Sequence, residues 1–167
     1  MDVARQLWSD NPPQSLDYFD PDRLSRLYST GFVTAYKAAQ KNPVFGLEEG
    51  ESEGNPFDYD VVANSQDGCP LEDIKAEKTG EAAGGVTVTV TFKLWRCVED
   101  AAERDALSEV RFLLIEENGK QVIDDIVRVM DGEQLSLLEE MQYIASGEAD
   151  VGEDAPAIPL DEAENEE

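Results

Sequence analysis

The chemistry open to this chain is limited first by a residue type that it lacks. Its 167 residues include no histidine. Histidine-based catalytic triads, histidine general bases and histidine metal ligands are therefore excluded. An enzyme made from this chain would have to use carboxylates, tyrosine, lysine or cysteine.

The adjacent carboxylates Asp124 and Asp125 are the clearest acid–base candidates. Both fall in a predicted strand, where neighbouring side chains point to opposite faces, so they cannot act on one substrate as a pair. We expect Asp125 to share a face with Phe112 and Leu114. If that face is concave and apolar, the pKa of Asp125 would rise, as a general acid or base requires. The alternative is a structural carboxylate that accepts hydrogen bonds from tyrosine, tryptophan or backbone groups, or one at an open sheet edge.

The two cysteines, Cys69 and Cys97, do not have the spacing of a zinc site, which would use CxxC pairs or histidine. Their positions favour a disulfide. With a hairpin turn centred near Ala83, the two sulfurs face each other across neighbouring strands. The alternative is two independent small residues. A disulfide would indicate a periplasmic or secreted protein, and free thiols would indicate a cytoplasmic one.

Closely spaced carboxylates near the N-terminus could also form a calcium-binding loop. Asp17, Asp20 and Asp22 lie close together but lack the glycine and the terminal bidentate glutamate of that motif. Asp20, followed by Pro21, is better explained as a helix N-cap. No glycine-rich loop suits a phosphate, so we expect no metal and no cofactor.

The charge of the chain is strongly negative. Thirteen Lys and Arg against 38 Asp and Glu give a net charge of −25. Such a surface repels phosphate backbones, and no apolar run reaches the length of a membrane span, so we expect neither nucleic-acid binding nor membrane insertion. The charge fits solubility or adaptation to salt, or a docking surface for a basic partner.

The apolar pattern predicts helices first and strands afterwards. Asp20 and Pro21 open a long helix whose apolar residues recur at three- and four-residue steps until Asn42-Pro43 ends it. Residues 46–56 form a polar, glycine-rich loop. Residues 86–95 alternate valine and threonine as a strand does, and Asn118-Gly119 is a hairpin turn between two further strands. The remaining expected elements are a short helix near the N-terminus, an edge strand over 71–78, strands over 109–116 and 121–130, and a helix over 133–145.

These elements predict an α+β protein in three parts. Residues 1–19 are an N-terminal arm with a short helix. Residues 20–145 are an α+β domain in which a long N-terminal helix packs on a curved antiparallel β-sheet. Residues 146–167 are a disordered acidic tail, because they offer almost nothing to bury.

Two stretches carry a resemblance to a known family. Residues 58–67, which end in Ser65-Gln66-Asp67 before the valine–threonine strand, form the first stretch, and residues 114–126, Leu-Ile-Glu-Glu-Asn-Gly-Lys-Gln-Val-Ile-Asp-Asp-Ile, form the second. Over residues 15–130 the chain resembles a bacterial family without assigned function in the cystatin-like, nuclear-transport-factor-2-like superfamily. The resemblance implies a helix on a curved sheet and an exported protein. It implies no catalytic set.

The sequence as a whole predicts an exported, non-enzymatic binding or accessory domain. Two alternatives are an acidic inhibitor or immunity protein that binds a basic toxin or enzyme, and a small carboxylate-dependent enzyme that uses Asp125. The partner would be a basic protein or a small ligand in the concave face of the sheet. Trp8 and Trp95 are interpreted as packing residues, although Trp95 is also a pocket candidate. The complete set of pocket candidates is Gln66, Asp67, Trp95, Phe112 and Asp125.

Overall fold

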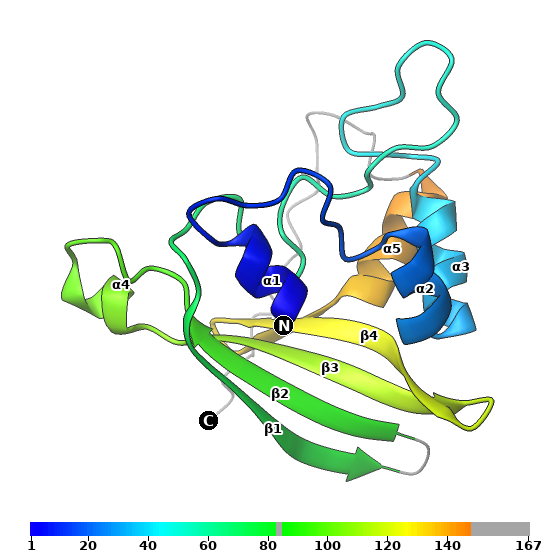
Figure 1. Cartoon of the computed structure of the whole chain (residues 1–167). Helices are drawn as coiled ribbons and strands as arrows, with labels where there is room; N and C mark the ends of the chain where they lie inside the picture. The colour runs from blue at the N-terminus through cyan, green and yellow to red at the C-terminus, as the bar shows by residue number, and fades with distance from the viewer. Residues whose placement is uncertain (83–84, 148–167) are drawn as a thin grey trace, which may run out of the picture.

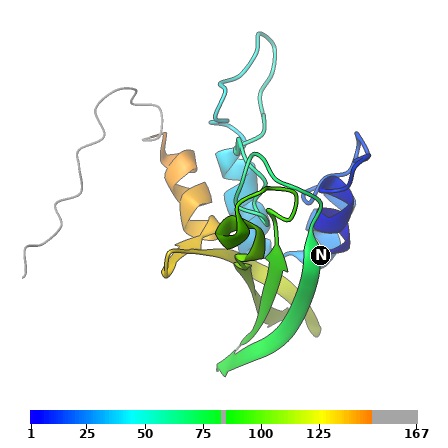
Figure 2. The ribbon, with the colours of Figure 1, turned by 90° about the vertical axis from the view of Figure 1, so that its left-hand side faces the viewer.

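The computed structural model describes residues 1–82 and 85–147 as an α+β fold. One antiparallel sheet has the order β1-β2-β3-β4-β5, and the helices α1, α2, α3 and α5 lie on one side of it (Figures 1 and 2). The predicted α+β class and antiparallel meander are thereby confirmed. The strands are β1 (Glu72–Ala82), β2 (Gly85–Lys93), β3 (Ser108–Glu117), β4 (Lys120–Met130) and β5 (Glu133–Ser136). The helices are α1 (Asp2–Leu7), α2 (Pro21–Leu27), α3 (Thr30–Ala39), α4 (Ala101–Asp105) and α5 (Leu137–Ser146).

The N-terminal helical region is two short helices, so the prediction of one long helix was wrong. Between α2 and α3 the chain extends at Tyr28, with φ −113° and ψ 152°. The N–H of Ser29 donates to the carbonyl of Ile123 in β4 at 2.8 Å. The hydroxyl of Ser29 accepts from the N–H of Phe32 and so caps α3. The break therefore fastens both helices to the sheet.

The central hairpin forms as its turn residues predict. Asn118 and Gly119 both have positive φ, 54° and 74°, as a two-residue type I′ turn requires. The pairing of β3 with β4 then shifts at a β-bulge. Leu114 pairs with Ile123, whereas Leu113 pairs with Asp125. Because Phe112 pairs with Ile126, Phe112 and Asp125 point to opposite faces, and the expectation of a shared face was wrong.

The hydrophobic core lies between the sheet and the helices. Phe92, Val110 and Ile126 point into it from the sheet. Phe19, from the N-terminal arm, is buried against Tyr36 with 4.6 Å between the ring centroids. The arm therefore shares the core of the rest of the chain.

The C-terminal helix begins later than the sequence predicted. Residues 133–136 pair with β4 as the edge strand β5, and only then does α5 start, capped by the hydroxyl of Ser136. A four-residue edge strand is too short to show a period of its own, which is why the sequence predicts a helix across it.

The predicted disulfide is present. Cys69 and Cys97 are bonded, with their Cα atoms 5.8 Å apart. They lie just beyond the paired ends of β1 and β2, where the N–H of Cys69 donates to the carbonyl of Leu94 at 2.8 Å. The predicted turn centre near Ala83 and nearly all of the predicted acidic tail lie outside the described residues. Within the described part of the chain, no helix is long and apolar enough to cross a membrane.

Candidate functional site

Asp125 occupies a structural position. Its side chain is 7% exposed. One carboxylate oxygen accepts from the N–H groups of Ile126 and Leu138 at 2.8 and 2.9 Å, and the other accepts from the hydroxyl of Ser136 at 2.6 Å. Burial raises the pKa of Asp125, although these three hydrogen bonds oppose the rise. The carboxylate thus holds the first turn of α5 against β4.

A held loop stands beside the C-terminal half of α5. We call residues 41–54 the site loop. Its neck is closed because the N–H of Gly54 donates to the carbonyl of Gln40 at 2.8 Å. A Cβ on Gly54 would lie 2.9 Å from the ring of Pro43, so the close approach at the neck requires glycine. The amide of Asn42 donates to the carbonyls of Ile144 and Ala145, both at 3.3 Å, which fastens the loop to the end of α5.

The site loop carries large apolar side chains into solvent. Val44, Phe45 and Leu47 are 49, 83 and 41% exposed. Tyr143, on the neighbouring turns of α5, is 53% exposed. Figures 1 and 2 show the loop projecting away from the sheet, beyond the ends of α3 and α5. Exposed apolar side chains gathered in this way are typical of interaction sites.

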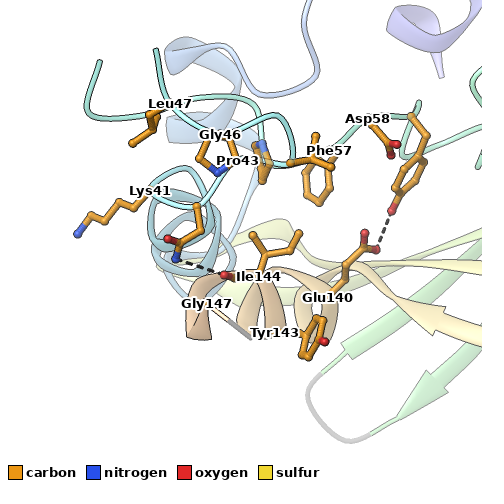
Figure 3. A pocket seen from close by; sticks show the side chains of 14 residues that line it. Lys41, Pro43, Gly46, Leu47, Phe57, Asp58, Glu140, Tyr143, Ile144 and Gly147 are labelled. Carbon is orange, nitrogen blue, oxygen red and sulfur yellow. Dashed lines mark hydrogen bonds between the residues drawn. The ribbon is translucent and has the colours of Figure 1, made fainter. Parts of the chain in front are cut away.

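A cavity of about 480 Å³, which we call the loop cavity, lies between the site loop, the 56–59 segment and α5 (Figure 3). Its buried apolar wall includes Phe57 and Ile144. Leu47 and Tyr143 stand at its rim. This size and lining suit an apolar side chain or a small organic group.

Arg128 holds two residues that line the loop cavity, Tyr59 and Glu140. It is 5% exposed and donates to the hydroxyl of Tyr59 and to the carboxylate of Glu140. The Tyr59 hydroxyl in turn donates to Glu140 at 2.6 Å, as Figure 3 shows. The charge of Glu140 is therefore balanced by Arg128 at 2.5 Å. This part-buried ion pair and the hydroxyl of Tyr59 connect the 56–59 segment to α5.

A second cavity, of about 520 Å³, is lined by the same segment. We call it the aromatic cavity, because Trp8, Phe45, Phe57 and Tyr59 line it. It shares the residues 57–59 with the loop cavity. The segment is thus a common wall between the two.

Asp60 sets the floor of the aromatic cavity. One of its oxygens accepts from the indole N–H of Trp8 at 2.9 Å and from the hydroxyl of Tyr18 at 2.8 Å. The other accepts from the N–H groups of Val62 and Ala63. Burial, followed by the charge of Asp60, raises the pKa of Tyr18, so this hydroxyl stays a donor. The bonds from Trp8 and Tyr18 tie the N-terminal arm to the 60–65 turn, and those from Val62 and Ala63 hold the turn itself.

Asp58 differs from the other carboxylates of the two cavities. It is exposed, it lies on the common wall, and it accepts from the side chain of Gln66 at 3.0 Å. Within residues 1–82 and 85–147, no lysine or arginine forms an ion pair with it. Asp58 therefore presents an unbalanced negative charge to both cavities.

The pocket residues that the sequence predicted are not gathered in one place. Gln66 lines the aromatic cavity, while Asp67, beside it, is exposed and lines neither cavity. Trp95 and Phe112 are half-buried and pack against the core. Asp125 serves α5, as described above. The sequence missed the site loop, although an apolar Val44-Phe45 pair beside a polar, glycine-rich run was the available signal.

Comparison with known proteins adds no further constraint. No protein-family model, curated protein or solved structure matches this chain. The resemblance to the nuclear-transport-factor-2-like family therefore stays a prediction. In the described part of the chain, no group of three or more carboxylate or cysteine side chains is placed to hold a metal ion.

Proposed function

We propose that this chain is an exported, non-enzymatic binding domain, and that its ligand is a protein segment which inserts an apolar side chain into the loop cavity. The observation that carries the proposal is the exposure of Val44, Leu47 and Tyr143 around a cavity with an apolar wall, next to the exposed Phe45 of the same loop. Exposed apolar groups of this kind are typical of interaction sites. The closed neck of the site loop supports the proposal, because a held loop loses little entropy when it binds.

Two further observations support the other parts of the proposal. A disulfide is consistent with an oxidising compartment, and we place the protein in the periplasm or outside the cell. The hydrogen bonds of Asp125 fit a structural role better than acid–base catalysis. We also propose membership of the cystatin-like, nuclear-transport-factor-2-like superfamily, on the motifs named above and on the order of helices and strands.

Selection from a displayed library of random peptides tests the binding site. The full chain is the bait, and the peptides that are enriched are measured against three proteins. These are the unchanged chain, a rim variant with Leu47→Ser and Tyr143→Ser, and a control with Leu27→Ser and Leu107→Ser. The control residues are 42 and 63% exposed and line neither cavity.

We expect the selected peptides to bind the unchanged chain and the control with equal Kd. The rim variant should bind them roughly tenfold or more weakly, because it loses the burial of two large apolar side chains. Equal binding to all three proteins, or no enriched peptide at all, would contradict the proposal.

A further inference from the structure

We infer that the occupant of this site is a basic protein segment in which a lysine or arginine stands next to a bulky apolar residue. The inference rests on the proposed function, and it adds the chemistry of the partner. The apolar side chain enters the loop cavity, and the cationic group lies at Asp58, on the wall shared with the aromatic cavity.

The first argument is the charge that surrounds the apolar rim. The site loop contains four glutamates and one lysine, Lys41. These glutamates, Glu48, Glu49, Glu51 and Glu53, lie within a few residues of the exposed Phe45 and Leu47. Lys41 also lines the loop cavity, but the four glutamates outnumber it in the site loop, and this net negative charge favours a partner of the opposite sign.

The second argument is the state of the individual carboxylates. Glu140 is already balanced by Arg128, and Asp60 is occupied by four hydrogen-bond donors. Asp58 accepts one hydrogen bond, from the neutral Gln66. Of the three, it is the carboxylate placed to receive a cation from solvent. A charge-assisted hydrogen bond to it would be stronger than one between neutral groups.

The third argument is the aromatic character of the adjoining cavity. The faces of tryptophan, tyrosine and phenylalanine rings attract cations. The common wall already accommodates one such contact, since the guanidinium of Arg128 lies 5.1 Å from the centre of the Tyr59 ring. A lysine or arginine at Asp58 would find Trp8 and Phe45 in the same cavity.

A second copy of this chain is a poor candidate for the occupant. Each copy carries a net charge of −25, so two copies repel each other. A basic partner gains from the same charge, because the field draws it in and raises the rate of association.

The peptides selected as above test this inference through their composition and through single charge changes. We expect enrichment of lysine or arginine beside leucine, isoleucine, phenylalanine or tryptophan. Asp58→Asn should weaken the binding of these peptides by about tenfold, as the loss of one charge-assisted hydrogen bond implies. The matched control is Asp67→Asn, which removes a nearby exposed carboxylate that lines neither cavity, and it should leave Kd unchanged.

The glutamates of the site loop are tested by a matched pair of fourfold variants. The first variant replaces the four glutamates of the site loop with glutamine: Glu48, Glu49, Glu51 and Glu53. The second variant makes the same change at four exposed glutamates elsewhere: Glu77, Glu99, Glu103 and Glu116. Both lose the same total charge. The first should associate with the peptides several-fold more slowly at low salt than the second, and 1 M salt should remove the difference.

The outcomes separate this inference from the proposed function. The selected peptides could instead be apolar, without basic residues, and bind through Leu47 and Tyr143 with a Kd that Asp58→Asn does not change. That result would overturn the inference and leave the proposed function standing. An absence of enriched peptides would overturn both. Self-association of the chain in sedimentation, abolished by the rim variant, would identify a second copy as the occupant and would also overturn the inference.

Discussion

The role of Asp125 gives the sharpest prediction about the fold. Replacing Asp125 with alanine removes the acceptor of two N–H groups, those of Ile126 and Leu138, and of the Ser136 hydroxyl. A buried donor left without a partner costs about 1–3 kcal/mol. The hydroxyl can rotate to another acceptor, and the variant is freed from burying a carboxylate. We therefore expect Asp125→Ala to lower the free energy of unfolding by about 2–4 kcal/mol.

Asp125→Asn is the matched control, because its amide oxygen can accept from both N–H groups while its NH₂ donates to the Ser136 hydroxyl. We expect it to cost about 1 kcal/mol or less near neutral pH. Urea unfolding of the three proteins supplies the measurement. If the alanine variant were as stable as the asparagine variant, the carboxylate would not be holding α5, and the reasoning would be refuted.

The pH dependence of the same comparison has a definite sign. Burial raises the pKa of Asp125 in the folded protein, so the folded state binds the proton more tightly than the unfolded state does. The contribution of Asp125 to stability is then fully present below about pH 4, the ordinary value for aspartate, and falls as pH rises through the raised value. Relative to Asp125→Asn, the unchanged protein should lose stability over that interval. A gain over the same interval would show that the hydrogen bonds outweigh burial.

Three further predictions concern stability. Replacing both Cys69 and Cys97 with alanine should lower the free energy of unfolding by about 3–4 kcal/mol, since the disulfide closes a loop with a sequence separation of 28 and so restricts the unfolded chain. A loss below about 1 kcal/mol in urea unfolding would contradict this explanation. Arg128→Met should cost about 1–3 kcal/mol, because the partly exposed Glu140 loses its cationic partner and keeps the hydrogen bond from Tyr59. Adding Glu140→Gln should restore part of the loss, whereas two additive losses would contradict a coupled pair. Raising salt to 1 M should increase Tm, because a charge of −25 repels itself across the surface, and a decrease in Tm would mean that local ion pairs dominate.

The sheet was largely predictable because its signals are local. The valine–threonine alternation of β2 and the Asn118-Gly119 turn each follow from the conformations that those residues favour. The disulfide followed from the same register. The carboxylate at Asp20 caps α2 as its sequence context indicates.

The features that the sequence did not predict depend on contacts between distant residues. The break at Tyr28 exists because the backbone there pairs with Ile123, which no helical period reveals. The bulge beside Asp124 changes which face Asp125 occupies, and a strict alternation of faces cannot anticipate it. The bulge and three hydrogen bonds together place the carboxylate of Asp125 at the start of α5.

The site was missed for a related reason. A polar, glycine-rich run predicts a loop, but not a loop whose neck is closed by Gly54 and whose base is fastened to α5 by Asn42. The two cavities are separated by a segment whose position depends on Arg128, in a strand far along the chain. The exposed Phe45 indicates a binding site only once the residues that line the two adjacent cavities are known.

The binding site can be mapped on the full chain by following its amide chemical shifts as a selected peptide is added. On titration, the account predicts the largest shifts in the site loop, in residues 56–59 and in the last turns of α5, with smaller shifts in Asp58→Asn at the same peptide concentration. Shifts centred instead on the sheet face that carries Thr89 and Arg111, or along β1, with the site loop unmoved, would contradict it.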